Sequence, residues 1–245
     1  MSEKYVERSY RNSFKNDRLV YFNVKVKQTD LRIGADSDLH YQAFASVDKY
    51  REIVEAYIAK HPDFLTSFSP VKASPNASFL IKKMCDAAFD ADVGPMAAIA
   101  GAIAQEVGKD LLKYSEQVIV ENGGDVFIQC KQNIKVGIFT GESPFKDKLA
   151  INIQSNYMPV GVCTSSGRIG PSVSFGKSDA VTILSKSTYL ADAAATAVAN
   201  RLKSTDDLEE TIEYAQSIKG VTGVVAVIGN KIGAWGQVEL VEWNS

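Results

Sequence analysis

Three segments of the chain combine residue types and spacings that could do chemistry. In the first, an apolar run breaks at Asn122-Gly123-Gly124-Asp125 and then resumes. Asn-Gly is common in β-hairpin turns, so a plain turn is one interpretation. The other is that the two glycines let the backbone approach a ligand closely, while Asn122 and Asp125 present polar groups to it.

The second segment places three consecutive hydroxyl groups beside a glycine and an arginine. Thr164, Ser165 and Ser166 are followed by Gly167 and Arg168. Backbone N–H groups, hydroxyls and a guanidinium are the usual ligands of phosphate, so the segment predicts an anion-binding turn. An exposed hairpin turn with solvent-facing serines is the alternative.

The third segment is an alanine-rich helical run, 191–197, that contains an aspartate and a threonine. Asp192 and Thr196 are four positions apart and therefore lie on the same face of a helix. A carboxylate and a hydroxyl among alanines suit a hard cation such as Mg²⁺, which keeps waters and takes further oxygens from substrate phosphates. An acid that complements the helix dipole is the other interpretation.

A glycine-rich helix entry, 94–101, also has two interpretations. It is either a tightly packed helix start or an N-terminus whose free N–H groups bind an anion.

Histidine and cysteine chemistry is not expected. The two histidines, His40 and His61, lie far upstream of the three hydroxyls, so a Ser-His-Asp triad is disfavoured. The three cysteines are widely separated and form no CxxC pair, which excludes a zinc-finger or disulfide framework.

The overall composition is that of a globular protein. The 245 residues are 45% apolar and carry a net charge of −2. This near-neutral balance gives no indication of binding to nucleic acid or to an anionic membrane. The N-terminus is polar, and the longest apolar stretch, 94–104, is about half of what a membrane-spanning helix needs. We therefore expect a soluble protein of the cytoplasm.

The elements that must position these segments are segregated along the chain. Alternation predicts strands within 4–34, seven short strands between 117 and 184, and a final hairpin turning at Gly229-Asn230. Helical patterns cover 44–58, a stretch beginning near 74–76, 96–114, 187–202 and 205–219. This order favours an α+β fold in one domain, 1–245, with an antiparallel sheet and helical pairs. Two strands, two helices and two strands occur twice, which suggests an internal duplication.

Together the segments resemble the ApbE-like superfamily, the FAD:protein FMN transferases. The resemblance covers about residues 92–203 and rests on four motifs in order: Glu121 to Asp125, Val136-Gly137-Ile138 with Pro144, Thr164 to Gly167, and Ala191 to Ala197 after the strand 181–184. It implies a T-fold-like arrangement with internally duplicated ββαα-type units. It also implies Mg²⁺ on Asp192 and Thr196 and a flavin-nucleotide pocket, for FAD, lined by the two turns. This chain resembles a short cytosolic branch, since the histidine-containing segment of the transferases is missing between Gly167 and Val181.

These features favour a protein that binds a small nucleotide-like ligand with Mg²⁺ and transfers FMN or hydrolyses the pyrophosphate. Asp179 is the candidate general base, and Arg168 or Lys177 would add positive charge. The alternatives are a non-catalytic module that binds a nucleotide or small anion, and a structural subunit of a homo-oligomer. We expect no nucleic acid and no membrane among its partners.

Overall fold

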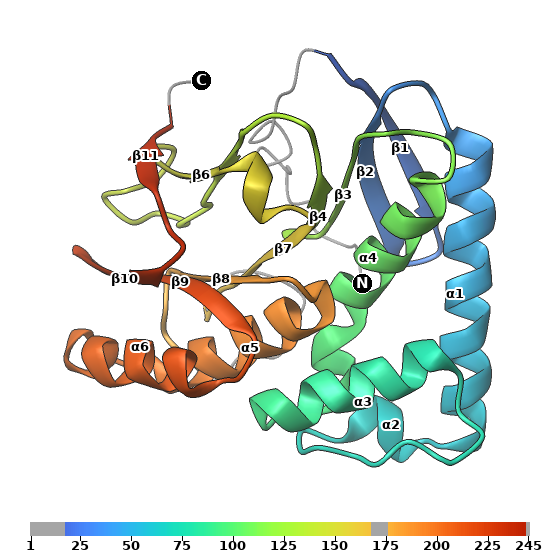
Figure 1. The fold of residues 1–245 in the computed structure, drawn as a ribbon. Coiled ribbons are helices and arrows are strands. Elements are labelled where there is room, and N and C mark those ends of the chain that lie inside the picture. The colour runs from blue at the N-terminus through green and yellow to red at the C-terminus, as the bar shows by residue number, and fades with distance from the viewer. Residues whose placement is uncertain (1–17, 168–175, 244–245) are drawn as a thin grey trace, which may run out of the picture.

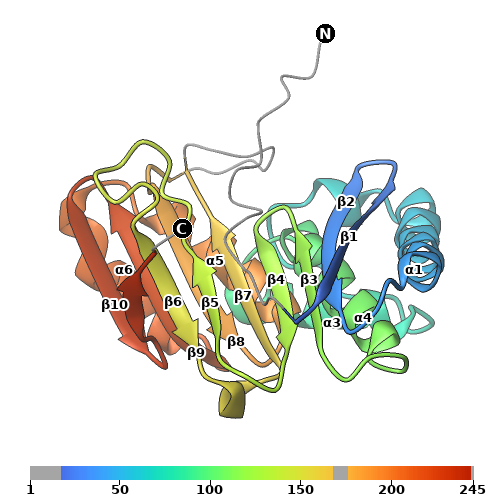
Figure 2. The same cartoon turned by 90° about the horizontal axis from the view of Figure 1, so that it is seen from above.

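The computed structural model describes residues 18–167 and 176–243. Its central element is one antiparallel sheet with the strand order β1-β2-β3-β4-β7-β8-β9-β10 (Figures 1 and 2). The strands of this sheet are β1 (Val20–Val26), β2 (Thr29–Ala35), β3 (Val118–Asn122), β4 (Asp125–Gln129), β7 (Val160–Ser165), β8 (Ala180–Ser185), β9 (Val221–Ile228) and β10 (Lys231–Gly236).

The helices lie on one face of this sheet (Figure 1). They are α1 (His40–Lys60), α2 (Asp63–Thr66), α3 (Phe79–Ala91), α4 (Ile99–Leu111), α5 (Thr188–Arg201) and α6 (Leu208–Ser217). Short 3₁₀ turns cover Pro95–Ala98, Ser155–Tyr157 and Thr205–Asp207. α1 to α4 connect β2 to β3, and α5 and α6 connect β8 to β9.

A second, three-stranded sheet covers the opposite face of the large sheet, as Figure 2 shows. Its order is β11-β6-β5, with β5 (Ile134–Gly137), β6 (Leu149–Ile153) and β11 (Leu240–Glu242). Strand alternation divides the core between the two faces. On β7, for example, Cys163 packs toward the helices, whereas Val162 packs toward the small sheet.

The expected α+β class and antiparallel sheet are confirmed. The element order also contains two strands, helices and two strands twice, from β1 to β4 and from β7 to β10. The internal duplication and the T-fold assignment stay predictions, as does the single domain.

Most predicted elements are present, with differences at their ends. The third helix begins at Phe79, because the Ser78 side chain, rather than the stretch 74–76, accepts a hydrogen bond from the Ile81 N–H. The expected helix 96–114 is a 3₁₀ turn followed by α4, which ends at Leu111. The hairpin at Gly229-Asn230 is confirmed, and the strand predicted at 172–175 lies outside the described residues.

Within the described residues, no single helix is long and apolar enough to cross a membrane. In this part of the chain, one pair of consecutive segments, α3 and Pro95–Leu111, reaches the length and apolar composition of a span, but the two segments meet at an angle of 105°. Cys85, Cys130 and Cys163 are buried free thiols.

Candidate functional site

The turn between β3 and β4 is a hairpin, as one of its two interpretations predicted. Asn122 pairs with Asp125, and between them Gly123 and Gly124 have φ values of 69° and 111°. A side chain there would be strained, so this turn requires its glycines. The Asn122 Nδ2 donates a hydrogen bond to the Ala100 carbonyl oxygen over 3.1 Å, which joins the turn to the first turn of α4.

Asp125, the first residue of β4, faces the helices and is buried. Burial raises the pKa of its carboxyl to about 7, and the negative charge of Glu121 adds to this effect. Hydrogen bonds from the Cys163 thiol and the Thr164 backbone N–H act in the opposite direction. Asp125 is therefore a buried acid that titrates near neutrality.

Asp192 lies in the middle of α5 with its carboxylate directed at α4. Its Oδ2 accepts a hydrogen bond from the Gly101 N–H at 2.8 Å. Burial raises the pKa of Asp192 well above its usual range, and repulsion from the charge of Asp125 raises it further. Two buried carboxyl groups that repel each other need a proton or a cation between them.

Close approach of α4 and α5 depends on the glycine in this contact. A Cβ atom on Gly101 would lie 2.3 Å from the Thr188 carbonyl oxygen and 2.8 Å from the Asp192 Cβ. The glycine-rich helix entry is therefore packed, as one of its two interpretations predicted. At Gly101 the N–H is already bonded to Asp192 rather than free for an anion.

Thr196 lies one helical turn beyond Asp192 on α5 and is half-buried. Residues four apart on a helix share a face, so the hydroxyl and the carboxylate point to the same side. Among the described residues, the Thr196 hydroxyl has no hydrogen-bond partner. The pair is positioned as the sequence predicted, whereas metal binding to it stays a prediction.

A metal at this position would have few protein ligands. No group of three or more His, Cys, Asp and Glu residues suited to a metal ion occurs in the part of the chain that the structure describes. Mg²⁺ is the hard cation that this donor set fits, because it is commonly held by one or two carboxylates, waters and substrate phosphates.

The hydroxyl-rich segment at the end of β7 is divided between two faces of the sheet. Thr164 lies on the face opposite to Cys163, and its Oγ1 is 2.9 Å from that of Thr182. The Ser166 hydroxyl donates to the Ser178 carbonyl oxygen over 3.4 Å. Of the three predicted hydroxyl groups, that of Ser165 is on the helix-facing side with Cys163.

Gly167 anchors the end of this segment to the residues before β8. Its N–H donates to the Ser178 carbonyl oxygen over 3.0 Å, and a Cβ atom on it would lie 2.4 Å from the Gly176 carbonyl oxygen. Arg168, the predicted cation of the turn, lies outside the described residues. Lys177 is exposed, and its backbone N–H donates to the Leu202 carbonyl oxygen.

Asp179, the predicted general base, is buried immediately before β8. Its Oδ2 accepts a hydrogen bond from the Gly229 N–H at 2.6 Å, and its own N–H donates to the Val227 carbonyl oxygen at 2.9 Å. These bonds hold the turn between β9 and β10. They give Asp179 a structural role, and its catalytic role stays a prediction.

Cys163 is a site residue to which the sequence assigned no role. Its thiol is fully buried between Asp125 and the N-terminal end of α5, where its Sγ is 3.7 Å from the Thr188 carbonyl oxygen. Burial and the charge of Asp125 raise the pKa of this thiol well above its usual range. The signal in the sequence was strand alternation, which places Cys163 and Ser165 on one face.

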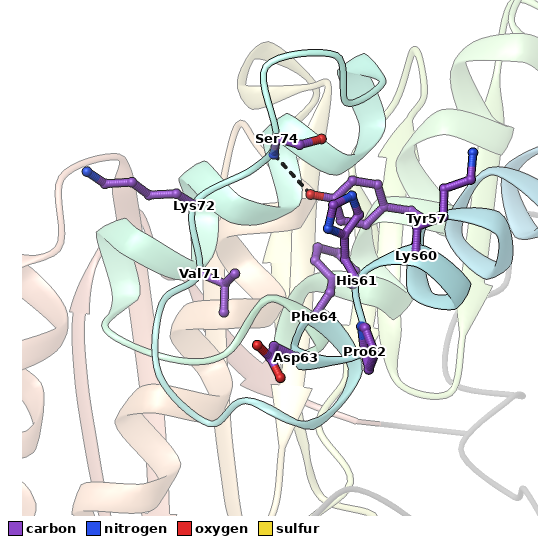
Figure 3. A pocket seen from close by; sticks show the side chains of 9 residues that line it. All are labelled: Tyr57, Lys60, His61, Pro62, Asp63, Phe64, Val71, Lys72 and Ser74. Atoms are coloured by element: carbon purple, nitrogen blue, oxygen red, sulfur yellow. Dashed lines mark hydrogen bonds between the residues drawn. The ribbon is translucent and has the colours of Figure 1, made fainter.

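A cavity of about 260 Å³ lies away from these residues, at the C-terminal end of α1 (Figure 3). Tyr57 and His61 stack in it with ring centroids 4.3 Å apart, and the Tyr57 hydroxyl accepts a hydrogen bond from the Ser74 N–H. Figure 3 shows the Lys60 and Lys72 side chains extending away from each other. The two cations therefore do not converge on one ligand.

Solved structures with a similar arrangement of helices and strands show which fold this protein has. It superposes on the flavin transferase ApbE of Vibrio cholerae, in its H257G mutant, with a TM-score of 0.55 and 12% identity, covering 89% of this chain and 97% of that one. For the apo form of the flavinyl transferase ApbE of Pseudomonas stutzeri, the TM-score is 0.51 and the sequence identity 14%, and the match covers 91% of this chain and 94% of that one. The chain has the fold of the ApbE flavin transferases.

The family follows from the sequence comparisons. A family model described as AbpE bacteria matches residues 11–230. A UPF0280 protein of Methanococcus maripaludis strain C5 is 37% identical over 221 residues, which are 88% of this chain and 90% of the relative. One from Methanocaldococcus jannaschii is 37% identical over 224 residues, covering 89% and 91%. The protein belongs to this AbpE family and is similar to the UPF0280 proteins along most of its length.

Proposed function

We propose that the protein binds FAD or a related flavin nucleotide together with Mg²⁺, and that it breaks the pyrophosphate bond, either by hydrolysis or by transfer of FMN to an acceptor. The observation on which this depends is the buried pair Asp125 and Asp192, whose carboxyl pKa values are both raised by burial and by neighbouring negative charge. Such a pair is costly unless a positive charge compensates it. The ApbE fold, whose solved members include flavin transferases, supports the choice of ligand.

In this proposal, Asp192 and Thr196 hold the metal ion, and Asp125 adds negative charge beside it. Asp192 can do so while it remains bonded to the Gly101 and Ala100 N–H groups of α4, because the two oxygens of a carboxylate together accept about four hydrogen bonds or metal contacts. Bound Mg²⁺ would neutralise charge that develops on the phosphate oxygens. The Gly123-Gly124 turn and the turn from Ser165 to Gly167 line the nucleotide pocket, with Arg168 as its proposed cation. Thr164 contributes through its backbone N–H, which bonds to Asp125, because its hydroxyl lies on the other face of the sheet.

The reaction breaks one phosphoanhydride bond. The oxygen of water, or of an acceptor hydroxyl, attacks the phosphorus on the FMN side, and the other phosphate leaves with the adenosine part as AMP. Water gives free FMN, whereas an acceptor hydroxyl gives an FMN ester. Asp179 is the candidate that accepts the proton of the attacking hydroxyl.

Calorimetric titration of the full chain with FAD, with Mg²⁺ or with EDTA, tests binding. Saturable binding that requires Mg²⁺ is expected, and chromatography of the same mixture should detect FMN and AMP in equal amounts. Absence of FAD binding at high micromolar concentration contradicts the proposal. Binding without products would identify the protein as the non-catalytic nucleotide-binding module.

A further inference from the structure

The groove between α6 and β10 is a second surface with the properties of a binding site. It has a volume of about 600 Å³ and lies at the end of the large sheet, where α6 packs beside β10 (Figure 1). Its floor is apolar, because Leu208 and Ile212 of α6 pack closely over Gly233 of β10. A Cβ atom placed on Gly233 would lie 3.1 Å from the Ile212 side chain and 3.2 Å from that of Leu208. The groove is thus apolar at its base and bounded on one side by a strand.

β10 is the last strand of the eight-stranded sheet and pairs only with β9 in the described part of the chain. Lys231 and Ile228 close the two-residue turn of the hairpin, so they form a hydrogen-bonded pair. Because hydrogen-bonded pairs alternate along an antiparallel ladder, the backbone groups of Gly233 and Trp235 also bond to β9. The backbone N–H and C=O groups of Ile232 and Ala234 therefore point away from the sheet, toward the open edge.

The wall of the groove is acidic. Asp206, Glu209 and Glu213 line it from the α6 side, and all three are exposed. None of them forms a salt bridge with a described residue. Among the described residues that line it, Lys231 is the one cation. An unpaired strand edge thus runs beside uncompensated carboxylates.

We propose that this groove binds an extended peptide segment of a partner protein, which adds a strand to β10 and places lysine or arginine side chains against α6. Backbone hydrogen bonds to an open edge provide affinity in this mode, and alternate side chains provide specificity. Alternate residues of the added strand face α6, so the cationic residues should occur at every second position.

The acidic wall also argues against a second copy of this chain in the groove. Pairing of two β10 strands about a twofold axis would bring Glu209 and Glu213 of both copies to the same interface, where like charges repel. A cationic partner removes this cost.

The test uses two fluorescein-labelled probe peptides and the full-length protein. One probe alternates lysine with valine over six residues, and the other replaces each lysine with glutamate. Fluorescence anisotropy should show saturable binding of the lysine probe that weakens with added NaCl, and at least about tenfold weaker binding of the glutamate probe.

Three variants separate the parts of the proposal. Ala234→Pro removes an outward N–H at an edge position where proline is tolerated, and it should abolish binding. The double variant Glu209→Gln with Glu213→Gln should weaken binding about tenfold. Glu210→Gln, on the same helix but outside the groove, should leave it unchanged.

Several results would overturn the proposal. One is no saturable binding of the lysine probe. Another is unchanged binding by Ala234→Pro in a sample whose circular dichroism matches the wild type, which would indicate charge attraction alone. A third is a dimer, measured by light scattering, that Ala234→Pro dissociates, since the edge would then belong to a second copy. If Ala234→Pro does not fold, unchanged binding by the double glutamine variant is sufficient to reject the proposal.

Discussion

Asp192 of α5 accepts a hydrogen bond from the Gly101 N–H of α4 over 2.8 Å. A reciprocal contact runs in the other direction: the Gln105 side chain of α4 accepts a hydrogen bond from the Thr188 N–H of α5 over 2.7 Å. N–H groups near the start of each helix thereby find partners on the other helix. The charge of Asp125 also raises the pKa of Asp192. One residue therefore takes part both in the packing of the two helices and in the electrostatics of the candidate site.

The contact at Gly101 predicts a large loss of stability for Gly101→Ala. Its new methyl group would lie 2.3 Å from the Thr188 carbonyl oxygen, so α4 and α5 must separate. We expect the free energy of unfolding in urea to fall by about 1–3 kcal/mol or more. Gly123→Ala is the control: no atom lies within 4 Å of its new Cβ, and the left-handed backbone alone should cost about 1 kcal/mol. Equal losses would contradict the packing argument.

Two substitutions of Asp192 distinguish its hydrogen bond from its charge. Asp192→Ala leaves the Gly101 N–H buried without an acceptor, which should cost about 1–3 kcal/mol. Asp192→Asn retains an acceptor and removes the repulsion with Asp125, so its stability in EDTA should equal or exceed that of the wild type. Urea unfolding monitored by circular dichroism measures both. A destabilised Asp192→Asn would show that the negative charge itself is needed for folding.

The raised pKa of Asp125 predicts how stability changes with pH in EDTA. Its pKa is about 7 in the folded protein, against an ordinary value of 3.8. Between these values the folded state holds a proton that the unfolded chain has released. The free energy of unfolding should therefore fall as the pH rises toward 7 and then level off. The total fall should be at most about 1.4 kcal/mol for each unit by which the folded-state pKa exceeds the ordinary value. In Asp125→Asn this fall should be smaller, and the part that remains belongs to Asp192, whose pKa burial also raises. A slope as steep in the variant as in the wild type would contradict the assignment to Asp125.

Asp179 is tested by comparing two variants. Asp179→Ala removes the acceptor of the Gly229 N–H and should lower stability by about 1–3 kcal/mol. Asp179→Asn keeps that acceptor and should fold normally. If Asp179 is the general base, Asp179→Asn binds FAD as the wild type does but releases little FMN and AMP. Normal product formation by this variant would leave Asp179 with its structural role alone.

The sequence predicted what depends on local periodicity. Alternating apolar residues located β3, β4, β7 and β8, and the Gly229-Asn230 turn located the final hairpin. The spacing of Asp192 and Thr196 correctly placed both on one side of α5. These features are set by neighbours within a few positions along the chain.

Contacts between distant residues were not predicted. The bond from Gly101 to Asp192 spans 91 positions, and the bond from Gly229 to Asp179 spans 50. No local pattern distinguishes an acid that caps another helix, or holds a turn, from one that faces a ligand. The role of Cys163 depends in the same way on the strand beside it, where Cys163 pairs with Asp125.

The most direct test of the account is the Mg²⁺ dependence of FAD binding in Asp192→Asn. The control is Asp207→Asn, an acid at the start of α6 whose bonds are to Ser204 and Lys203. We predict that calorimetry shows FAD binding that requires Mg²⁺ in the wild type and in Asp207→Asn, and that Asp192→Asn loses this requirement together with most of its affinity. Unchanged Mg²⁺-dependent binding by a folded Asp192→Asn would contradict the metal site on which the proposed function depends.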